Sequence, residues 1–160
     1  MNQDVPGPLP TRLVFLSELP NLPVGSKVRF LGCVSKYTIA KGILTLEHND
    51  SVSSPNRKGP RRAPGARIDV DVNLLLESLS HSDIDIGNWI NVIGYVRPLS
   101  PAPSLVLQNE ILKSGGGRKK PSSVYVEALM IIPAGGIRVG EYERVLSESR
   151  EVDKRLKGSS

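Results

Sequence analysis

Two pairs of aspartates are the residues of this sequence best suited to chemistry. Asp69 and Asp71 stand two positions apart, which places both carboxylates on one face of a β-strand. Asp83 and Asp85 form a second pair in the loop before the next strand. Paired carboxylates can hold Mg²⁺ for phosphoryl transfer, but neither pair has a third ligand or a basic phosphate clamp at suitable spacing. We therefore interpret Asp69 and Asp71 as the solvent face of a half-buried strand, and a small nuclease stays open only as an alternative to test.

The other reactive residue types are too few to build a site. Cys33 is the single cysteine, so the chain has no disulfide framework, and with two histidines, His48 and His81, it lacks the ligands of an ordinary structural zinc site. We interpret both histidines as surface residues and Cys33 as a small buried hydrophobe on a strand. The segment Gly115–Lys120 lacks the spacing of a phosphate-binding loop. The sequence predicts a protein that is not an enzyme, with no catalytic residue, no metal and no cofactor.

Positive charge is concentrated in two segments rich in Gly, Pro and Ser. Residues 50–67 hold five basic residues against one acid, and residues 113–120 hold four basic residues and no acid. The net charge of the whole chain is +5, so the rest of the chain is mildly acidic. The two segments are either arms that contact nucleic-acid phosphates or solvated insertions. The candidate phosphate contacts are Arg57, Lys58, Arg61, Arg62, Arg118, Lys119 and Lys120.

The apolar pattern predicts short strands followed by one long helix. The 15 Gly and 13 Pro among 160 residues exclude a helical bundle and favour many turns. A short helix is expected over Leu74–Leu79, and a bulge or bend at Gly32. An amphipathic helix is expected over Val139–Leu156. The expected strands are Lys27–Tyr37, Ile43–His48, Arg67–Val72, Trp89–Val96 and Val124–Ile132, with Leu105–Leu112 as a further candidate.

This order of elements predicts an all-β fold: a five-stranded OB-fold barrel with a short helix between strands three and four and a C-terminal amphipathic helix. The expected divisions are an extended lead-in over 1–25, the barrel over 26–137 and the helix with its tail over 138–160. The barrel carries basic insertions at about 50–66 and 113–122. An apolar patch in the lead-in is expected to dock on the barrel. No apolar run approaches the roughly 20 residues of a membrane span, and the start lacks the pattern of a signal peptide.

Three aromatic residues on the expected strands are candidate stacking platforms for nucleic-acid bases. They are Tyr37, Trp89 and Tyr95, of which Tyr37 and Tyr95 are kept as candidate nucleic-acid contacts. The alternative is that they cover the barrel ends or pack beneath the terminal helix. Only seven aromatic residues occur in the whole chain, which is few for a protein that grips single strands unaided.

The terminal helix carries an apolar stripe that is a candidate partner surface. Its members recur at spacings of three and four, as one face of a helix requires. The stripe either folds back on the barrel or docks on a matching helix of a partner, and both can hold at once. The stripe consists of Tyr142, Val145, Leu146, Val152 and Leu156, with Ser149 as its one polar residue.

Taken in order, a set of segments resembles the smallest OB-fold subunit of the telomere-capping CST complex in its fungal form. The resemblance covers roughly residues 13–150 and skips the two basic segments. The matching segments are Phe15–Pro20, Val24–Val34, Gly42–His48, Gly87–Tyr95, Val126–Ile131 and Glu141–Leu146.

The resemblance implies a nuclear, non-enzymatic protein of the telomeric region of chromosomes. It implies a heterodimer with the middle OB-fold subunit through the terminal helix, the docking residues being Tyr142, Val145, Leu146 and Val152. It further implies partnership with the largest CST subunit, single-stranded telomeric DNA and DNA polymerase alpha–primase, whose fill-in synthesis the complex would support. The small subunit of replication protein A, a general single-strand binder, shares much of this layout and stays open, as does a purely structural scaffold.

Overall fold

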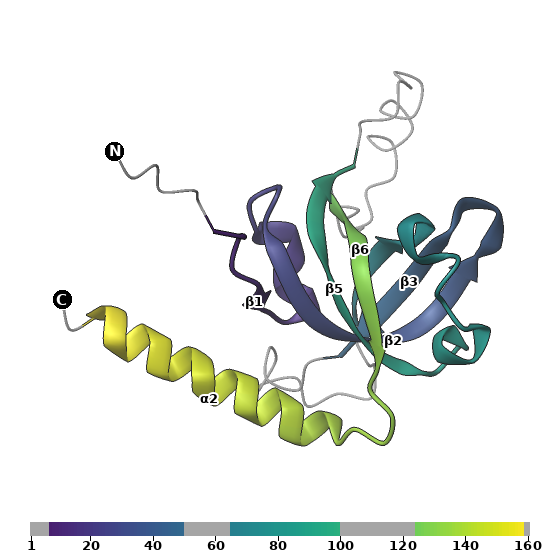
Figure 1. Cartoon of the computed structure of the whole chain (residues 1–160). Helices are drawn as coiled ribbons and strands as arrows, with labels where there is room; N and C mark the ends of the chain where they lie inside the picture. Colours follow the sequence, from purple (N-terminus) through teal and green to yellow (C-terminus); the bar gives the residue numbers. More distant parts are fainter. Residues whose placement is uncertain (1–6, 50–64, 100–123, 159–160) are drawn as a thin grey trace, which may run out of the picture.

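Five strands close into a barrel in the computed structural model, which describes residues 7–49, 65–99 and 124–158 (Figure 1). Antiparallel pairing joins β2 to β3, β3 to β4, β6 to β5 and β5 back to β2, while β4 and β6 pair in parallel. This closed order, with its single parallel contact, is that of an OB-fold, and the predicted fold is confirmed. The strands are β2 (Lys27–Thr38), β3 (Ile43–His48), β4 (Ala66–Asp71), β5 (Trp89–Pro98) and β6 (Val124–Pro133).

The core fills the barrel because apolar residues alternate along each strand. On β4, Ile68 and Val70 are buried, whereas Arg67 and Asp69 between them are exposed, as the alternation predicts. The lead-in contributes to the same core, since Leu16 and Leu19 of the 3-10 helix η1 (Leu16–Asn21) are almost completely buried. A two-residue strand, β1 (Arg12–Leu13), pairs in parallel with the start of β2. The docking of the apolar patch is thus confirmed, and the lead-in is more structured than an extended segment.

Two glycines allow close packing where the strands cross. A Cβ at Gly32 would lie 2.9 Å from the Cβ of Leu46, and a Cβ at Gly94 would lie 2.2 Å from the carbonyl oxygen of Glu127. The predicted bulge at Gly32 is misplaced, because the register of β2 shifts between Val34 and Lys36. Gly32 is needed for the approach of its neighbours rather than for a bulge.

The connection between β4 and β5 contains the expected short helix, in the form of 3-10 turns. The turns are η3 (Asn73–Leu75) and η4 (His81–Ile84). Side chains take the local hydrogen bonds: Asp71 Oδ1 accepts from the backbone N–H of Asn73 at 2.9 Å, and the Ser78 hydroxyl donates to the carbonyl of Leu75 at 3.1 Å. Such bonds compete with the regular helical ladder. The candidate strand Leu105–Leu112 lies outside the described residues.

The last element is the α-helix α2 (Val139–Gly158), which lies across one end of the barrel and extends past β1 (Figure 1). The short turn η2 (Ile39–Lys41), which joins β2 to β3, lies away from it. Among the described residues, no helix is long and apolar enough to cross a membrane. The relation between α2 and the barrel therefore decides which surfaces are left for other molecules.

Candidate functional site

The inner face of α2 is defined by Glu143, Leu146 and Arg150, whose spacing of three and four residues places them on one side of the helix. Glu143 and Leu146 are 4% and 3% exposed. The barrel surface across which α2 lies is also covered: Leu31 on β2 and its β5 partner Asn91 face outward, yet both are buried. The first half of α2 is therefore packed on the barrel.

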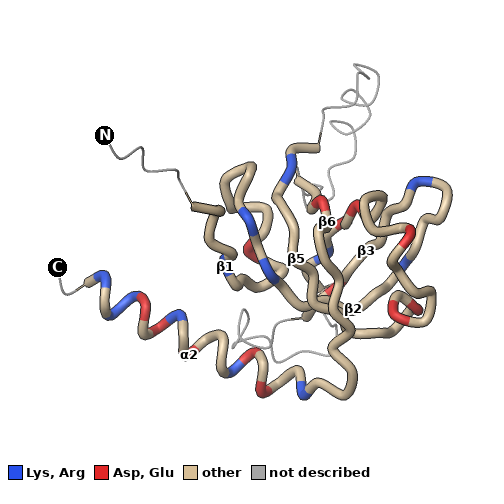
Figure 2. Tube along the Cα trace, viewed as in Figure 1, with Lys and Arg blue, Asp and Glu red and all other residues tan. Residues whose placement is uncertain are grey.

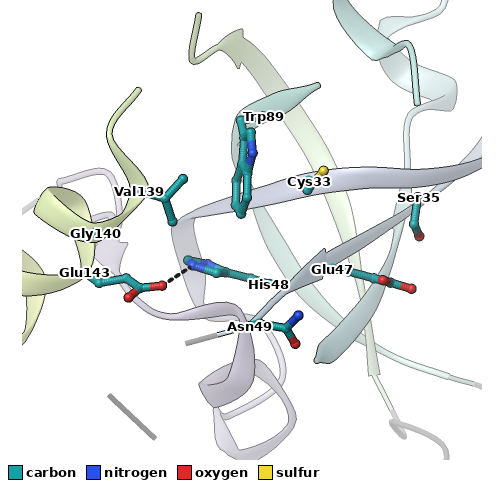
Figure 3. Close-up of a pocket in the computed structure, with 9 residues that line it drawn as sticks. All are labelled: Cys33, Ser35, Glu47, His48, Asn49, Trp89, Val139, Gly140 and Glu143. Carbon is teal, nitrogen blue, oxygen red and sulfur yellow. Dashed lines mark hydrogen bonds and ion pairs between the residues drawn. The ribbon is translucent and has the colours of Figure 1, made fainter. Parts of the chain in front are cut away.

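A buried contact between His48 and Glu143 holds the N-terminal part of α2. The Nε2 atom of His48 lies 3.0 Å from Oε1 of Glu143, and the Nδ1 atom lies 3.2 Å from the carbonyl oxygen of Leu31 (Figure 3). The edge of the His48 ring meets the Trp89 ring at 5.2 Å between centroids. His48 is 2% exposed, so its interpretation as a surface residue is wrong. It sits at the end of β3, where α2 covers the mouth of the barrel.

A second polar contact holds the middle of α2. The guanidinium of Arg150 donates to both carboxylate oxygens of Glu18, with 2.6 Å from Nη2 to Oε2, and also donates to the carbonyl oxygen of Leu13 at 3.1 Å. Glu18 in turn accepts from the backbone N–H of Phe15 at 2.6 Å. Arg150 therefore connects the C-terminal helix to the N-terminal lead-in.

The outer face of α2 is apolar and exposed. One narrow arc of the helix holds Val145, Ser149, Val152 and Leu156, and its centre lies about 120° around the axis from that of the inner face. The three apolar side chains are 59%, 53% and 69% exposed. We call these four residues the outer stripe. Within the part of the chain that the structure describes, the outer stripe covers no other element, and an exposed group of apolar residues of this kind is a candidate interaction site.

The predicted partner stripe is therefore divided between the two faces. Val145 and Val152 lie on the outer stripe, and Tyr142 is half-buried between the faces. Leu146 has to be reassigned, because it is buried and belongs to the contact between α2 and the barrel. The physical reason is the angle between neighbouring residues: Val145 and Leu146 differ by about 100° around the helix axis, so they cannot face the same way.

A pocket lies at the junction between α2 and the barrel. It has a volume of about 430 Å³ and is open beside His48 and Glu143 (Figure 3). Burial, and secondarily the carboxylate of Glu47, raise the pKa of the Cys33 thiol, which keeps the thiol protonated and weakly nucleophilic. Both ring nitrogens of His48 are already engaged. The pocket is lined by Cys33, Ser35, Glu47, His48, Asn49, Trp89, Val139, Gly140 and Glu143.

The aspartates that first suggested chemistry have local structural roles. Asp69 accepts a hydrogen bond of 2.8 Å from the hydroxyl of Thr45, and Asp71 accepts from the backbone and side-chain nitrogens of Asn73. No group of three or more metal-binding side chains occurs within the described ranges. Asp69 and Asp71 therefore act as the solvent face of β4.

The three strand aromatics have different surroundings. Tyr37 packs against the core, because the register shift before Lys36 turns its side chain inward. Trp89 lines the junction pocket beside the start of α2. Both Trp89 and Tyr95 keep the expected outward side of β5, and Tyr95 is half-buried with the Arg97 guanidinium 5.1 Å from its ring centroid. Tyr125, opposite Arg97 on β6, is an outward aromatic residue that the sequence analysis did not single out.

The predicted phosphate contacts all belong to the two basic segments. They lie outside the described residues, so their role stays a prediction. These residues are Arg57, Lys58, Arg61, Arg62, Arg118, Lys119 and Lys120.

A model of the Ten1 family, described as a telomere-capping subunit of the CST complex, matches residues 1–147. The chain belongs to the Ten1 family. This family is described by telomere capping and not by an enzyme class, and its work is at chromosome ends. The sequence left two OB-fold families open, the telomere-capping subunit and the small subunit of replication protein A. The match identifies the chain with the telomere-capping family.

Two relatives show how far the similarity extends. The Ten1 protein of Schizosaccharomyces pombe is 25% identical over 142 residues, which cover 89% of this chain and 96% of that protein. The crystal structure of the S. pombe Stn1–Ten1 complex contains a chain with a TM-score of 0.56 and 25% identity, covering 91% of this chain and 96% of that chain. The similarity thus extends over most of this chain, and the family model reaches into the first half of α2.

Proposed function

We propose that this Ten1-family chain is the small, non-catalytic subunit of a telomere-capping complex and binds its middle subunit through the outer stripe of α2. The observation that carries this proposal is that α2 is docked by Glu143, Leu146 and Arg150 while three aliphatic residues face outward. The S. pombe neighbour is a complex of Ten1 with Stn1, which supports a middle subunit as the partner here.

In the free chain α2 is already a formed helix. The exposed flanks of the outer stripe carry charged pairs at a spacing of four, Arg144 with Glu148 and Glu151 with Arg155. Such pairs add a few tenths of a kcal/mol each to helix stability and keep the free protein solvated. Less ordering entropy is then lost on binding, because the binding helix is already formed. An apolar helix face at this spacing fits a hydrophobic groove or a second helix.

The complex that this interface assembles has a wider role in the proposal. Together with its middle and largest subunits, the chain holds single-stranded telomeric DNA in the nucleus, at the telomeric region of the chromosome. The complex then supports fill-in synthesis by DNA polymerase alpha–primase. The family supports this role, because telomere capping takes place at chromosome ends. Within it, the main task of this chain is to bind the middle subunit.

The decisive experiment places a charge on the outer stripe. Val152→Glu introduces a carboxylate into the proposed contact but leaves the free chain folded, since Val152 is 53% exposed. Loss of one central apolar contact typically costs about 2 kcal/mol, which is about 30-fold in Kd. The full chain is co-expressed with the middle subunit of the same organism, and Kd is measured by calorimetry.

The matched control is Ile39→Glu, which makes the same kind of change at a residue 74% exposed on the turn between β2 and β3. We expect the control to bind normally and both variants to keep the thermal midpoint of the parent chain. If Val152→Glu and Val145→Glu both bind the middle subunit with parental affinity, the proposed interface is wrong.

A further inference from the structure

The barrel surface over β3 and β4 is poorly suited to nucleic acid. OB-folds usually bind oligonucleotides over the second and third barrel strands, which are β3 and β4 here. In this chain the outward residues of those strands include three carboxylates, Glu47, Asp69 and Asp71, against one guanidinium, Arg67. Arg67 is ion-paired with Glu47. The surface therefore repels a phosphate backbone.

The outer surface of β2, β5 and β6, outside the part that α2 covers, carries positive charge instead. Lys27 and Arg29 face outward on β2, and the register places them opposite Tyr95 and Ile93 of β5. Neither cation has an ion-pair partner within the part of the chain that the structure describes. Figure 2 shows basic positions on the first half of β2 and near the end of β5. Two unpaired cations beside an aromatic ring fit a nucleic-acid backbone and its bases.

A stacked group forms the centre of this surface. The Arg97 guanidinium lies over the Tyr95 ring and donates to Glu127 Oε1 at 3.1 Å, which holds it in place. Tyr95 is opposite Glu127 on β6, and Arg97 is opposite Tyr125. Nucleic-acid bases stack both on aromatic rings and on guanidinium planes. The group thus offers flat surfaces for bases beside the cations of β2.

This surface does not overlap the outer stripe of α2. The outer stripe is solvent-exposed, because it lies about 120° around the helix from the face that carries the buried Glu143 and Leu146. The cations of β2 and the stack on β5 lie on the barrel wall itself (Figure 1). The middle subunit and a nucleic-acid strand can therefore be bound at the same time.

We propose that a single-stranded nucleic acid crosses the outer surface of β2, β5 and β6. Its phosphates lie on Lys27 and Arg29, and its bases lie on the stacked Tyr95 and Arg97 and on the neighbouring Tyr125. We call this surface the β2–β5 face. The proposal rests on the DNA-binding role proposed above and assigns that role to a surface other than β3 and β4.

The test uses one double variant and one single variant of the full chain bound to its middle subunit. The probe is a fluorescein-labelled single-stranded G-rich telomeric oligonucleotide, and its affinity is measured by anisotropy over a range of salt concentrations. Lys27→Ala with Arg29→Ala is expected to weaken binding about tenfold and to reduce the salt slope by about 1.4, since each phosphate contact on a single strand contributes about 0.7. Tyr95→Leu is expected to weaken binding about tenfold at every salt concentration through lost stacking.

The matched control neutralises Lys36 and Lys41, two exposed lysines beside the β3 side of the barrel. The proposal predicts no change in affinity for this control. If only the control weakens binding, DNA is bound over β3 and the assignment to the β2–β5 face is wrong, while the DNA-binding role stands. If the complex binds the probe but no variant has an effect, direct DNA contact by the described part of this chain is wrong as well.

A protein ligand would give a different result. If Lys27→Ala with Arg29→Ala leaves DNA affinity unchanged but weakens binding of the middle subunit, the β2–β5 face is a protein interface, and the proposal is overturned. Ultraviolet crosslinking of the same probe provides an independent readout, with peptides containing Tyr95 or Tyr125 as the expected products.

Discussion

The barrel and the C-terminal helix of this Ten1-family chain are held by different kinds of contact. The barrel encloses an apolar core in which Phe30, Leu44 and Ile90 are completely buried. By contrast, the contacts that attach α2 to the described part of the chain include the buried side chain of Leu146 and the polar contacts of Glu143 and Arg150. The barrel fold therefore does not depend on α2, whereas the position of α2 depends on a few specific side-chain contacts. A helix held in this way can be positioned accurately and still keep its apolar side for a partner.

The largest effect is expected from a change inside the barrel. Gly94→Ala places a Cβ 2.2 Å from the carbonyl oxygen of Glu127, so β5 and β6 must separate. We expect a loss of about 3 kcal/mol or more in the free energy of unfolding, measured by urea titration of the full chain. Gly136→Ala is the control, since nothing lies within 4 Å of its Cβ. Equal stability of the two variants would contradict the tight packing of this barrel wall.

The second effect is on the helix alone. His48→Leu leaves the buried carboxylate of Glu143 without its imidazole partner, which typically costs about 3–5 kcal/mol. Undocking of α2 relieves that cost, so we expect faster amide exchange in α2 and unchanged exchange in the barrel strands. Combining His48→Leu with Glu143→Met removes both polar groups and should restore most of the protection. Slow exchange throughout α2 in the single variant would show that the pair does not hold the helix.

A smaller effect is expected from the second anchor. The Arg150 side chain is 23% exposed and that of Glu18 is 33% exposed, so solvent weakens their attraction. Arg150→Ala should cost about 1 kcal/mol of helix docking and should increase amide exchange mainly in the second half of α2. Arg155→Ala removes a guanidinium that is 82% exposed and serves as the control. An equal change in amide exchange in both variants would show that Arg150 does not anchor α2.

The smallest effect concerns the reactivity of Cys33, whose side chain lines the pocket at the junction between α2 and the barrel. The pKa of its thiol is raised, so at a given pH less thiolate is present than in an unfolded chain. Alkylation by iodoacetamide at pH 8 should therefore be slower in the folded chain than in urea, and its pH profile should be shifted to higher pH. His48→Leu should accelerate the reaction if α2 leaves the junction. A folded-state rate as fast as that in urea would contradict the burial of the thiol.

The barrel could be predicted from the sequence because its signal is local. Alternation such as that of Ile68 and Val70 with Arg67 and Asp69 determines which side of a strand is buried, and it places β4 within one residue. The short helix expected at Leu74–Leu79 forms one residue earlier, as the 3-10 helix Asn73–Leu75, for a local reason too: the carboxylate of Asp71 and the hydroxyl of Ser78 bond to the backbone there.

The junction could not be predicted, because its signal is spread over distant positions. Glu143 and Arg150 resemble solvent-facing charges until their partners are known, and those partners, His48 and Glu18, lie 95 and 132 positions away. Their spacing with Leu146 does match a helix face. A pattern that counts only apolar residues assigns that face to Val145, Leu146 and Val152 instead, and thereby merges the two sides of α2.

The bond between Glu18 and Arg150 has a consequence for the order of folding. Closing a chain segment of 132 residues costs about 4 kcal/mol of entropy, more than a partly exposed ion pair returns. The pair can therefore form only after the barrel has brought the lead-in and the end of β6 together. Docking of the 20-residue helix α2 therefore follows closure of the barrel. A nascent chain that has not finished its barrel cannot present the outer stripe in its final orientation, so assembly must follow folding.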